Sequence, residues 1–214
     1  MKSLAGVGAA VVGVASRVRG ERVIHAKGAA FSATLKVLPA AGWIGVPLAS
    51  GPSERRAVLR LSRAVGLPDA VPDVLGFAVR VFDADGAGGV QDLLLASSGT
   101  LPVLRHALTP RRDPLSTAYT SITPLDVCGQ RLLVGALPRN TRGRAEGSWF
   151  DLATAPLRGD WTTFAELHIG APLTEEESDA IGFDVAHDAG GFRADPVLRR
   201  LRALSYPAAR APEQ

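Results

Sequence analysis

The sequence predicts an α+β protein built around a small antiparallel β-barrel with a few flanking helices. Short segments of alternating polarity, separated by Gly and Pro, indicate several antiparallel strands. Two segments in the last third of the chain carry helix-capping signals instead. A length of 214 residues with 46% apolar residues suits a single domain, 1–214, with a sizeable core.

The strand prediction is strongest where apolar residues share one parity, because alternate side chains of a strand point to the same face. Asp83-Ala84-Asp85-Gly86 is a turn signal, so the strands on either side of it should form a hairpin. Segment 53–65 fits either a helix or a strand, because a cap-like start precedes an alternation of polar residues with leucines. The expected strands are 31–37, 77–81, 92–96, 131–136 and 164–169.

Two helices are expected near the C-terminus. Thr174 and Glu177 have the spacing of a capping box, which satisfies two free N–H groups at a helix start. Further on, Asp195 can cap a second helix and Pro196 suits its first position. An apolar stripe at helical spacing follows in Val197, Leu198, Leu201 and Leu204.

Composition excludes several classes of protein. A net charge of +3 gives no electrostatic footprint for nucleic acid, and no apolar run has the length of a membrane span. Residues 1–15 resemble a weak signal peptide, but the run is rich in Gly and Ala and Arg17 follows at once. We therefore expect a packed N-terminal segment and a cytoplasmic protein. The single cysteine, Cys128, allows no internal disulfide and is expected to be buried.

Two constellations could carry chemistry. Arg202 and Tyr206 lie four apart on the expected C-terminal helix and share a face, so the guanidinium could lower the phenol pKa. A phenolate can ligate ferric heme, although an ordinary amphipathic helix fits the same spacing. His25 follows a β-branched pair at an expected strand edge, where it could exchange protons or simply be a core histidine.

Three segments, in this order, resemble the catalase-like superfamily. ERVIHAKGAAFSATLKV, residues 21–37, resembles the signature around the family's distal histidine. VLRLSRAVGLPDAVPDVLGFAVRVFDADG, residues 58–86, resembles its Arg-x-Ser strand and the hairpin that follows. RLRALSYPAAR, residues 200–210, resembles the helix that carries the proximal heme ligand. The chain is therefore identified as a small member of this superfamily, with an expected catalase-like barrel.

The resemblance implies a heme b site between the barrel and the C-terminal helix. His25 would be the distal acid/base, with Ser62 orienting it and Ile24 packing on the porphyrin. The roles implied for the remaining matched positions are proximal iron ligand for Tyr206, its ionising partner for Arg202, and propionate partners for Arg22 and Arg60.

One departure from the family bears on activity. The family's distal asparagine is missing from Asp92-Leu93-Leu94-Leu95-Ala96-Ser97, where Ser97 is the nearest stand-in. The resemblance therefore favours a peroxidase that uses hydrogen peroxide to oxidise a small organic substrate. Alternatives are conversion of an organic hydroperoxide such as that of a fatty acid, weak catalase activity, and a non-enzymatic heme or lipid carrier. A homo-oligomer and a monomer are both compatible with the sequence.

Overall fold

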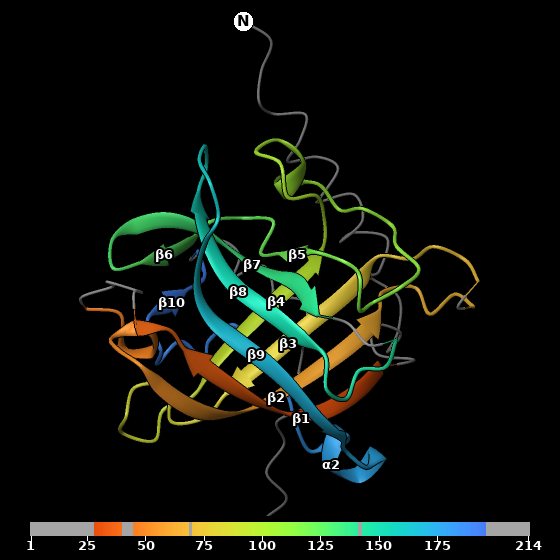
Figure 1. Cartoon of the computed structure of the whole chain (residues 1–214), viewed down its shortest axis with the longest axis horizontal. Helices are drawn as coiled ribbons and strands as arrows, with labels where there is room; N and C mark the ends of the chain where they lie inside the picture. The colour runs from red at the N-terminus through yellow and green to blue at the C-terminus, as the bar shows by residue number, and fades with distance from the viewer. Residues whose placement is uncertain (1–27, 40–44, 69, 141–142, 196–214) are drawn as a thin grey trace, which may run out of the picture.

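Eight antiparallel strands form a closed barrel in this computed structural model, which describes residues 28–39, 45–68, 70–140 and 143–195. Neighbouring strands follow the order β7-β5-β4-β3-β2-β1-β9-β8, and the pairing of β8 with β7 closes the ring (Figure 1). Two short strands, β6 and β10, extend the sheet beside β7. The bounds are β1 (Gly28–Val37), β2 (Ser53–Arg63), β3 (Leu75–Val81), β4 (Gln91–Ser97), β5 (Tyr119–Thr120), β6 (Leu125–Val127), β7 (Gln130–Asn140), β8 (Trp149–Pro156), β9 (Thr162–Pro172) and β10 (Phe192–Arg193).

The described part of the chain is mostly β, so the antiparallel barrel is confirmed and the α+β class is not. Its one α-helix is α2 (Glu175–Asp179), accompanied by the 3-10 turns η2 (Pro47–Ala49) and η3 (Leu104–His106). None of the helices in these residues is long and apolar enough to cross a membrane. The second expected helix, from Pro196 onward, lies outside the described residues.

Segment 53–65, which the sequence left open, is a strand through Arg63. It pairs with β1 along its whole length, from Val37 opposite Ser53 to Gly28 opposite Ser62. The alternation of polar residues with leucines was therefore the informative signal, since it matches the two faces of a barrel strand.

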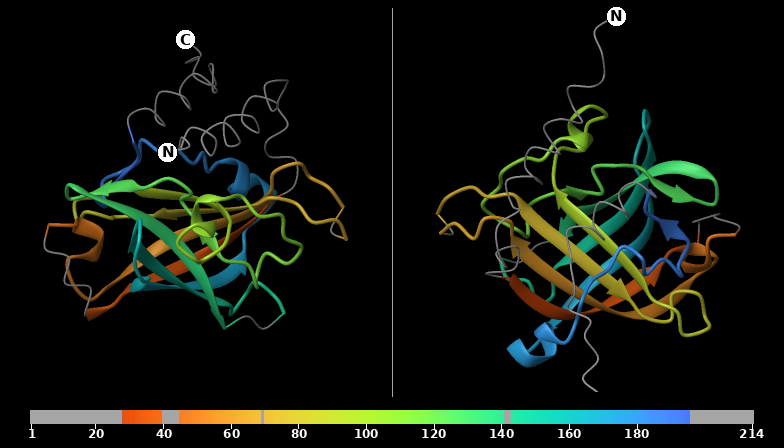
Figure 2. Two further views of the ribbon diagram at one scale, coloured as in Figure 1. Left: turned by 90° about the horizontal axis from the view of Figure 1, so that it is seen from above. Right: turned by 180° about the vertical axis from the view of Figure 1, so that it is seen from behind.

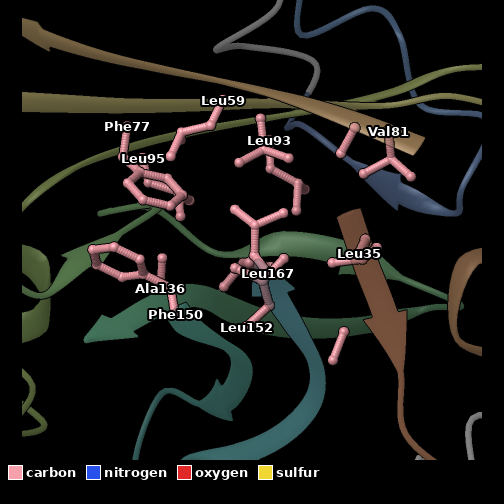
Figure 3. Packing of buried hydrophobic residues seen from close by; sticks show 14 of the residues in the cluster. Leu35, Leu59, Phe77, Val81, Leu93, Leu95, Ala136, Phe150, Leu152 and Leu167 are labelled. Atoms are coloured by element: carbon pink, nitrogen blue, oxygen red, sulfur yellow. The ribbon is translucent and has the colours of Figure 1, made fainter. Parts of the chain in front are cut away.

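The barrel interior holds the hydrophobic core, as alternate side chains from every long strand point inward (Figure 3). Three aromatic side chains meet at one end of it: the ring of Phe77 lies 4.9 Å from that of Tyr119 and 5.0 Å from that of Phe150. The Tyr119 hydroxyl donates to the Pro114 carbonyl at 2.8 Å, and burial raises the pKa of Tyr119. This tyrosine is therefore a neutral core residue.

Two local predictions are confirmed at the ends of strands. Thr174 and Glu177 form the expected capping box, with each side chain bonded to the other residue's backbone N–H. The β3–β4 connection is the expected hairpin, and Asp83 takes a left-handed conformation in its turn with φ of 51°. The carboxylate of Asp85 accepts N–H bonds from Ala87 and Gly89, which lower its pKa.

Candidate functional site

On the outer side of β1–β4, six of eight neighbouring residues are Gly, Ala or Ser. Since inward-facing residues of these strands fill the core, the opposite parity faces out, and it forms two rows across the four strands. One row is Gly28, Ser62, Gly76 and Ala96, and the next is Ala30, Arg60, Ala78 and Leu94. We call these eight residues the small-residue face. Strands β2, β3 and β4 lie side by side there in the right-hand view of Figure 2.

The glycines let two polar side chains lean across this face. A Cβ placed on Gly76 would stand only 2.4 Å from the Oγ of Ser62. A Cβ on Gly28 would stand 3.0 Å from the Nε of Arg60. Because neither glycine carries a side chain, a flat molecule can approach the sheet closely while Arg60 and Ser62 reach over it.

The guanidinium of Arg60 has no partner among the described residues, whereas Arg55, Arg63 and Arg105, whose Nε atoms are also shielded, make other bonds. Its Nε is shielded from solvent, and within the described residues it has no hydrogen-bond partner. Nor does any ion pair to a described carboxylate involve this guanidinium, unlike those of Arg55, Arg131 and Arg139. A buried guanidinium nitrogen without an acceptor is costly, and an external carboxylate would satisfy it. The residues present therefore fit the anionic edge of a heme.

The structure brings Arg60 and Ser62 together but does not bring Ser97 to the same face. Ser97 has the inward parity of β4 and is fully buried. Its hydroxyl accepts from the Leu75 N–H at 2.9 Å and donates to the Thr109 carbonyl at 2.7 Å. A catalytic role for Ser97 stays a prediction. The other candidates, Arg22, Ile24, His25, Arg202 and Tyr206, lie outside the described residues.

A charged cluster bounds the face on one side, and sequence reasoning missed it. Arg80 donates to both carboxylate oxygens of buried Asp92, at 2.8 and 2.6 Å, and the guanidinium also contacts the ring of Phe183. The Nδ1 of His187 lies 2.9 Å from the same carboxylate, which also accepts the Asp184 N–H. The cluster thus fastens the segment that follows α2 across the outside of β3 and β4 (Figure 2). Its signal in the sequence was a basic and an acidic residue at paired positions of the expected hairpin.

Two loops with exposed apolar side chains border the opposite edge of the face. One loop joins β2 to β3 and the other joins β4 to β5, so both leave the barrel next to the row of Ser62, Gly76 and Ala96. Mutual backbone bonds between Asp73 and Arg111 tie the two loops together. The exposed side chains are Val65, Leu67, Val71, Leu101, Val103 and Leu104. Exposed aliphatic groups on neighbouring loops favour contact with an apolar molecule.

Comparison with known proteins gives a fold but no sequence family. The sequence matches no protein-family model and no curated protein sequence. The structure resembles a bacterial catalase with a TM-score of 0.61, at 14% identity over 95% of this chain and 59% of that one. It also resembles catalase A from Saccharomyces cerevisiae with a TM-score of 0.62, at 12% identity over 92% of this chain and 62% of that one. The fold is therefore catalase-like, and the chain spans about three fifths of the length of these catalases.

Proposed function

We propose that this catalase-like barrel binds heme b against its small-residue face and works as a peroxidase. In the reaction, one hydrogen peroxide takes up two electrons and two protons and becomes two waters, and a small organic substrate supplies the electrons and is oxidised. The observation that carries the proposal is the shielded Nε of Arg60, which has no described partner and lies over a glycine on that face. An arginine in this position is suited to a heme propionate, which it can bind through charge-assisted hydrogen bonds.

The heme would be held from both sides. Arg60 and Arg22 bind its propionates and Ile24 packs on the porphyrin, while Tyr206 ligates the iron as a phenolate that Arg202 keeps ionised. The chain has two tyrosines, and Tyr119 is unsuited to this task because it is neutral and packed inside the barrel. Tyr206 is thereby the remaining phenol of the chain.

His25 is proposed as the proton-transfer residue. It precedes Gly28 by three residues, which is at most about 10 Å of chain, and Gly28 lies directly opposite Ser62. This pairing supports a role for the Ser62 hydroxyl in orienting the imidazole. One imidazole nitrogen of His25 takes a proton from the peroxide and returns it to the departing oxygen, which leaves as water. A bound heme supplies the electron-transfer chemistry that this proton transfer assists.

The apolar loops favour an organic substrate. They follow the strand ends that carry Ser62 and Ala96, and we propose that a reductant approaches the face by this edge. The same observation supports a second candidate, in which an apolar hydroperoxide such as that of a fatty acid is converted directly. Both reactions use the same heme and the same proton-transfer residue.

The first test compares the two tyrosines by absorption spectroscopy of the full chain reconstituted with heme. The unaltered protein should show a Soret band with high-spin ferric tyrosinate features. Tyr206→Phe should lose the heme or these features, because a phenyl ring cannot ligate iron. Tyr119→Phe is the matched control and should keep them. A tyrosinate spectrum that survives in Tyr206→Phe would eliminate Tyr206 as the ligand.

The enzyme and carrier readings separate in the same preparation. His25→Ala should keep the heme spectrum but lose peroxide-dependent oxidation of guaiacol, because the proton transfer is gone. Turnover without evolution of oxygen marks a peroxidase, and consumption of a fatty-acid hydroperoxide without guaiacol marks the second candidate. A heme that binds and never reacts with either peroxide would contradict both enzymes and leave a carrier.

A further inference from the structure

A shallow hollow lies on the outside of the barrel, beside the small-residue face. Its volume is about 310 Å³, and its lining includes Ser32, Thr34, Arg56, His168 and Gly170 from β1, β2 and β9. Thr34 is four residues along β1 from Ala30 of the small-residue face, which is about 13 Å of extended chain. Ser32 lies only two residues from Ala30, so the hollow adjoins the small-residue face, but none of the residues that line it belongs to that face.

Strand register gives the hollow two opposing walls. His168 and Arg56 both lie opposite Thr34, one on each neighbouring strand, so their backbones stand about 10 Å apart across β1. The ring of His168 is backed by Trp149, with 4.2 Å between ring centroids. The guanidinium of Arg56 is backed by the ring of Phe82, at 4.4 Å from its centroid. Each wall thus has an aromatic side chain packed against it, through a tilted ring pair at His168 and a cation–π contact at Arg56.

The bottom of the hollow, between His168 and Arg56, is open because Gly170 has no side chain there. A Cβ on Gly170 would come within 2.6 Å of the Oγ of Ser32, which donates its proton to the Ala171 carbonyl. The pairing of β1 with β9 is irregular between Phe31 and Ala33, beside this contact. Irregular pairing of this kind re-aims a side chain on the outside of a sheet.

The groups around the hollow lack partners among the residues that the structure describes. The guanidinium of Arg56 has neither a hydrogen bond nor an ion pair to any of them, although that of neighbouring Arg55 is paired with Asp83. The Thr34 hydroxyl has no hydrogen bond to a described residue either. The Nε2 of His168 is shielded from solvent without a hydrogen bond, and its nearest charge is the Glu166 carboxylate at 3.5 Å. A cation, a hydroxyl and a flat ring are therefore available together.

We propose that this hollow binds a small carboxylate with a flat apolar body. The carboxylate pairs with the planar guanidinium of Arg56, which presents parallel N–H donors, and accepts from the Thr34 hydroxyl. The flat body lies against the ring of His168, whose far side is already covered by Trp149. A ligand with one ring and one carboxylate spans the distance between the walls. This proposal does not depend on heme.

Benzoate is the probe, and benzamide is its neutral counterpart of the same shape. Titrations of the full chain, followed through backbone amide resonances in a two-dimensional NMR spectrum, should shift Thr34, Arg56 and Gly170 with benzoate. Benzamide should bind about tenfold more weakly, because the charge-assisted hydrogen bonds are lost. Equal affinity for both probes, or saturable shifts centred elsewhere, would overturn the proposal.

Two variants assign the binding to the hollow. Arg56→Gln should weaken benzoate binding about tenfold, since it removes the cation from the wall. Lys36→Gln removes a cation from the exposed side of the same sheet, two residues from Thr34 on β1, and should leave the affinity within about twofold. Thermal unfolding of each variant checks that the fold is intact. The proposal is refuted if Arg56→Gln binds benzoate as well as Lys36→Gln does.

Discussion

Ser97, which the sequence predicts to take part in catalysis, makes the hydrogen bonds of its hydroxyl within the fold. Its hydroxyl bonds both to the first N–H of β3 and to the carbonyl of Thr109, and no part of it is exposed. In the catalase-like superfamily that the sequence resembles, the asparagine expected at this point has a longer side chain that both donates and accepts hydrogen bonds. A serine held in this way has no free polar group to offer a ligand.

At this position we expect a large effect on stability. Ser97→Ala should lower the free energy of unfolding by about 1–3 kcal/mol, because the Leu75 N–H is left buried without an acceptor. Ser62→Ala, whose hydroxyl has no bond to a described residue, should change it by less than about 0.5 kcal/mol. Urea unfolding measures both. Similar losses in the two variants would contradict the structural role of Ser97.

Cys128 is a residue for which the expected burial was wrong. The side chain is exposed, and its thiol donates to the Gly45 carbonyl at 2.8 Å. It occupies the turn between β6 and β7, where φ is 51°. Cysteine is usually buried, but a two-residue hairpin places its turn residues in solvent regardless of type. The short strand β6 that creates this turn has too few residues to show a pattern.

At the scale of elements, a charged cluster joins β3 and β4 to the segment after α2, where an apolar contact would be the more common arrangement. Arg80 and Asp92 are paired through two hydrogen bonds, and the side chain of Asp92 is inaccessible to solvent. Such pairs add little to stability when intact, but breaking one leaves a buried charge. The cluster therefore acts as a specific fastening between distant parts of the chain.

Breaking the ion pair between Arg80 and Asp92 should lower the stability of the fold substantially. Arg80→Gln should lower the free energy of unfolding by about 3–5 kcal/mol, because Asp92 then stays buried without its cation. Arg131→Gln removes one member of the half-exposed pair with Asp195 and should cost less than about 1 kcal/mol. Chemical denaturation of the two variants gives the comparison. A loss below about 1 kcal/mol for Arg80→Gln would mean that Asp92 relaxes into solvent.

The β3–β4 turn gives a pH prediction. Two backbone N–H bonds from Ala87 and Gly89 lower the pKa of Asp85 from its ordinary value of 3.8. Its contribution to stability is therefore present above about pH 4 and is lost as the pH falls through the lower folded value. The stability difference between the unaltered chain and Asp85→Ala should shrink between neutral pH and pH 2. A difference that stays constant over this range would refute the turn's dependence on the carboxylate.

Strand prediction succeeded where one face of the barrel is apolar and the other polar. The segments 31–37 and 77–81 alternate cleanly and lie within β1 and β3. Strand β8 escaped prediction because four consecutive residues, 152–155, are buried, and the pairing with β9 shifts at Ala153. Barrel closure decides burial there, and no local pattern reports it. The α+β expectation failed because the confirmed capping box begins a helix of only five residues.

The site was predicted to the extent that strand parity could place it. Arg60 and Ser62 differ by two positions, so their shared face followed from the strand alternation once the segment was known to be β. The small-residue face could not be predicted in the same way, because its rows depend on the register of four strands. That register is fixed by tertiary packing and by the turns.

At the scale of the whole molecule, the barrel keeps a catalase-like arrangement at 14% and 12% identity to the two catalases. An inward apolar parity is enough to specify such a barrel, and many sequences satisfy it. The residues that point outward from the barrel are free to vary unless a ligand or another part of the chain packs against them. Small residues at Gly28, Gly76, Ala78 and Ala96 are therefore more informative about a bound group than the core is.

A larger side chain on the small-residue face should block heme binding without unfolding the barrel. Ala78→Leu adds a side chain to a half-buried outer position and should change the free energy of unfolding by less than about 1 kcal/mol. It should nevertheless abolish heme uptake, because the added side chain occupies the space above the sheet. Lys36→Leu, on the outer side of β1 away from that face, should retain heme. Heme titration followed by the Soret band checks both, and normal uptake by Ala78→Leu would place the heme elsewhere.

The closure of the barrel has a consequence for how the chain is made. Ser32 of β1 bonds to Ala171 across 139 residues of sequence, and β1 has β9 as its second neighbour. During synthesis β1 and β2 emerge before the other strands. The backbone groups along one edge of β1 stay unpaired until β9 has left the ribosome. Strands so far apart in the sequence pair slowly, and until they pair their exposed edges are prone to aggregation. Chains truncated before β9 should therefore aggregate, which a ribosome-release series followed by sedimentation would show.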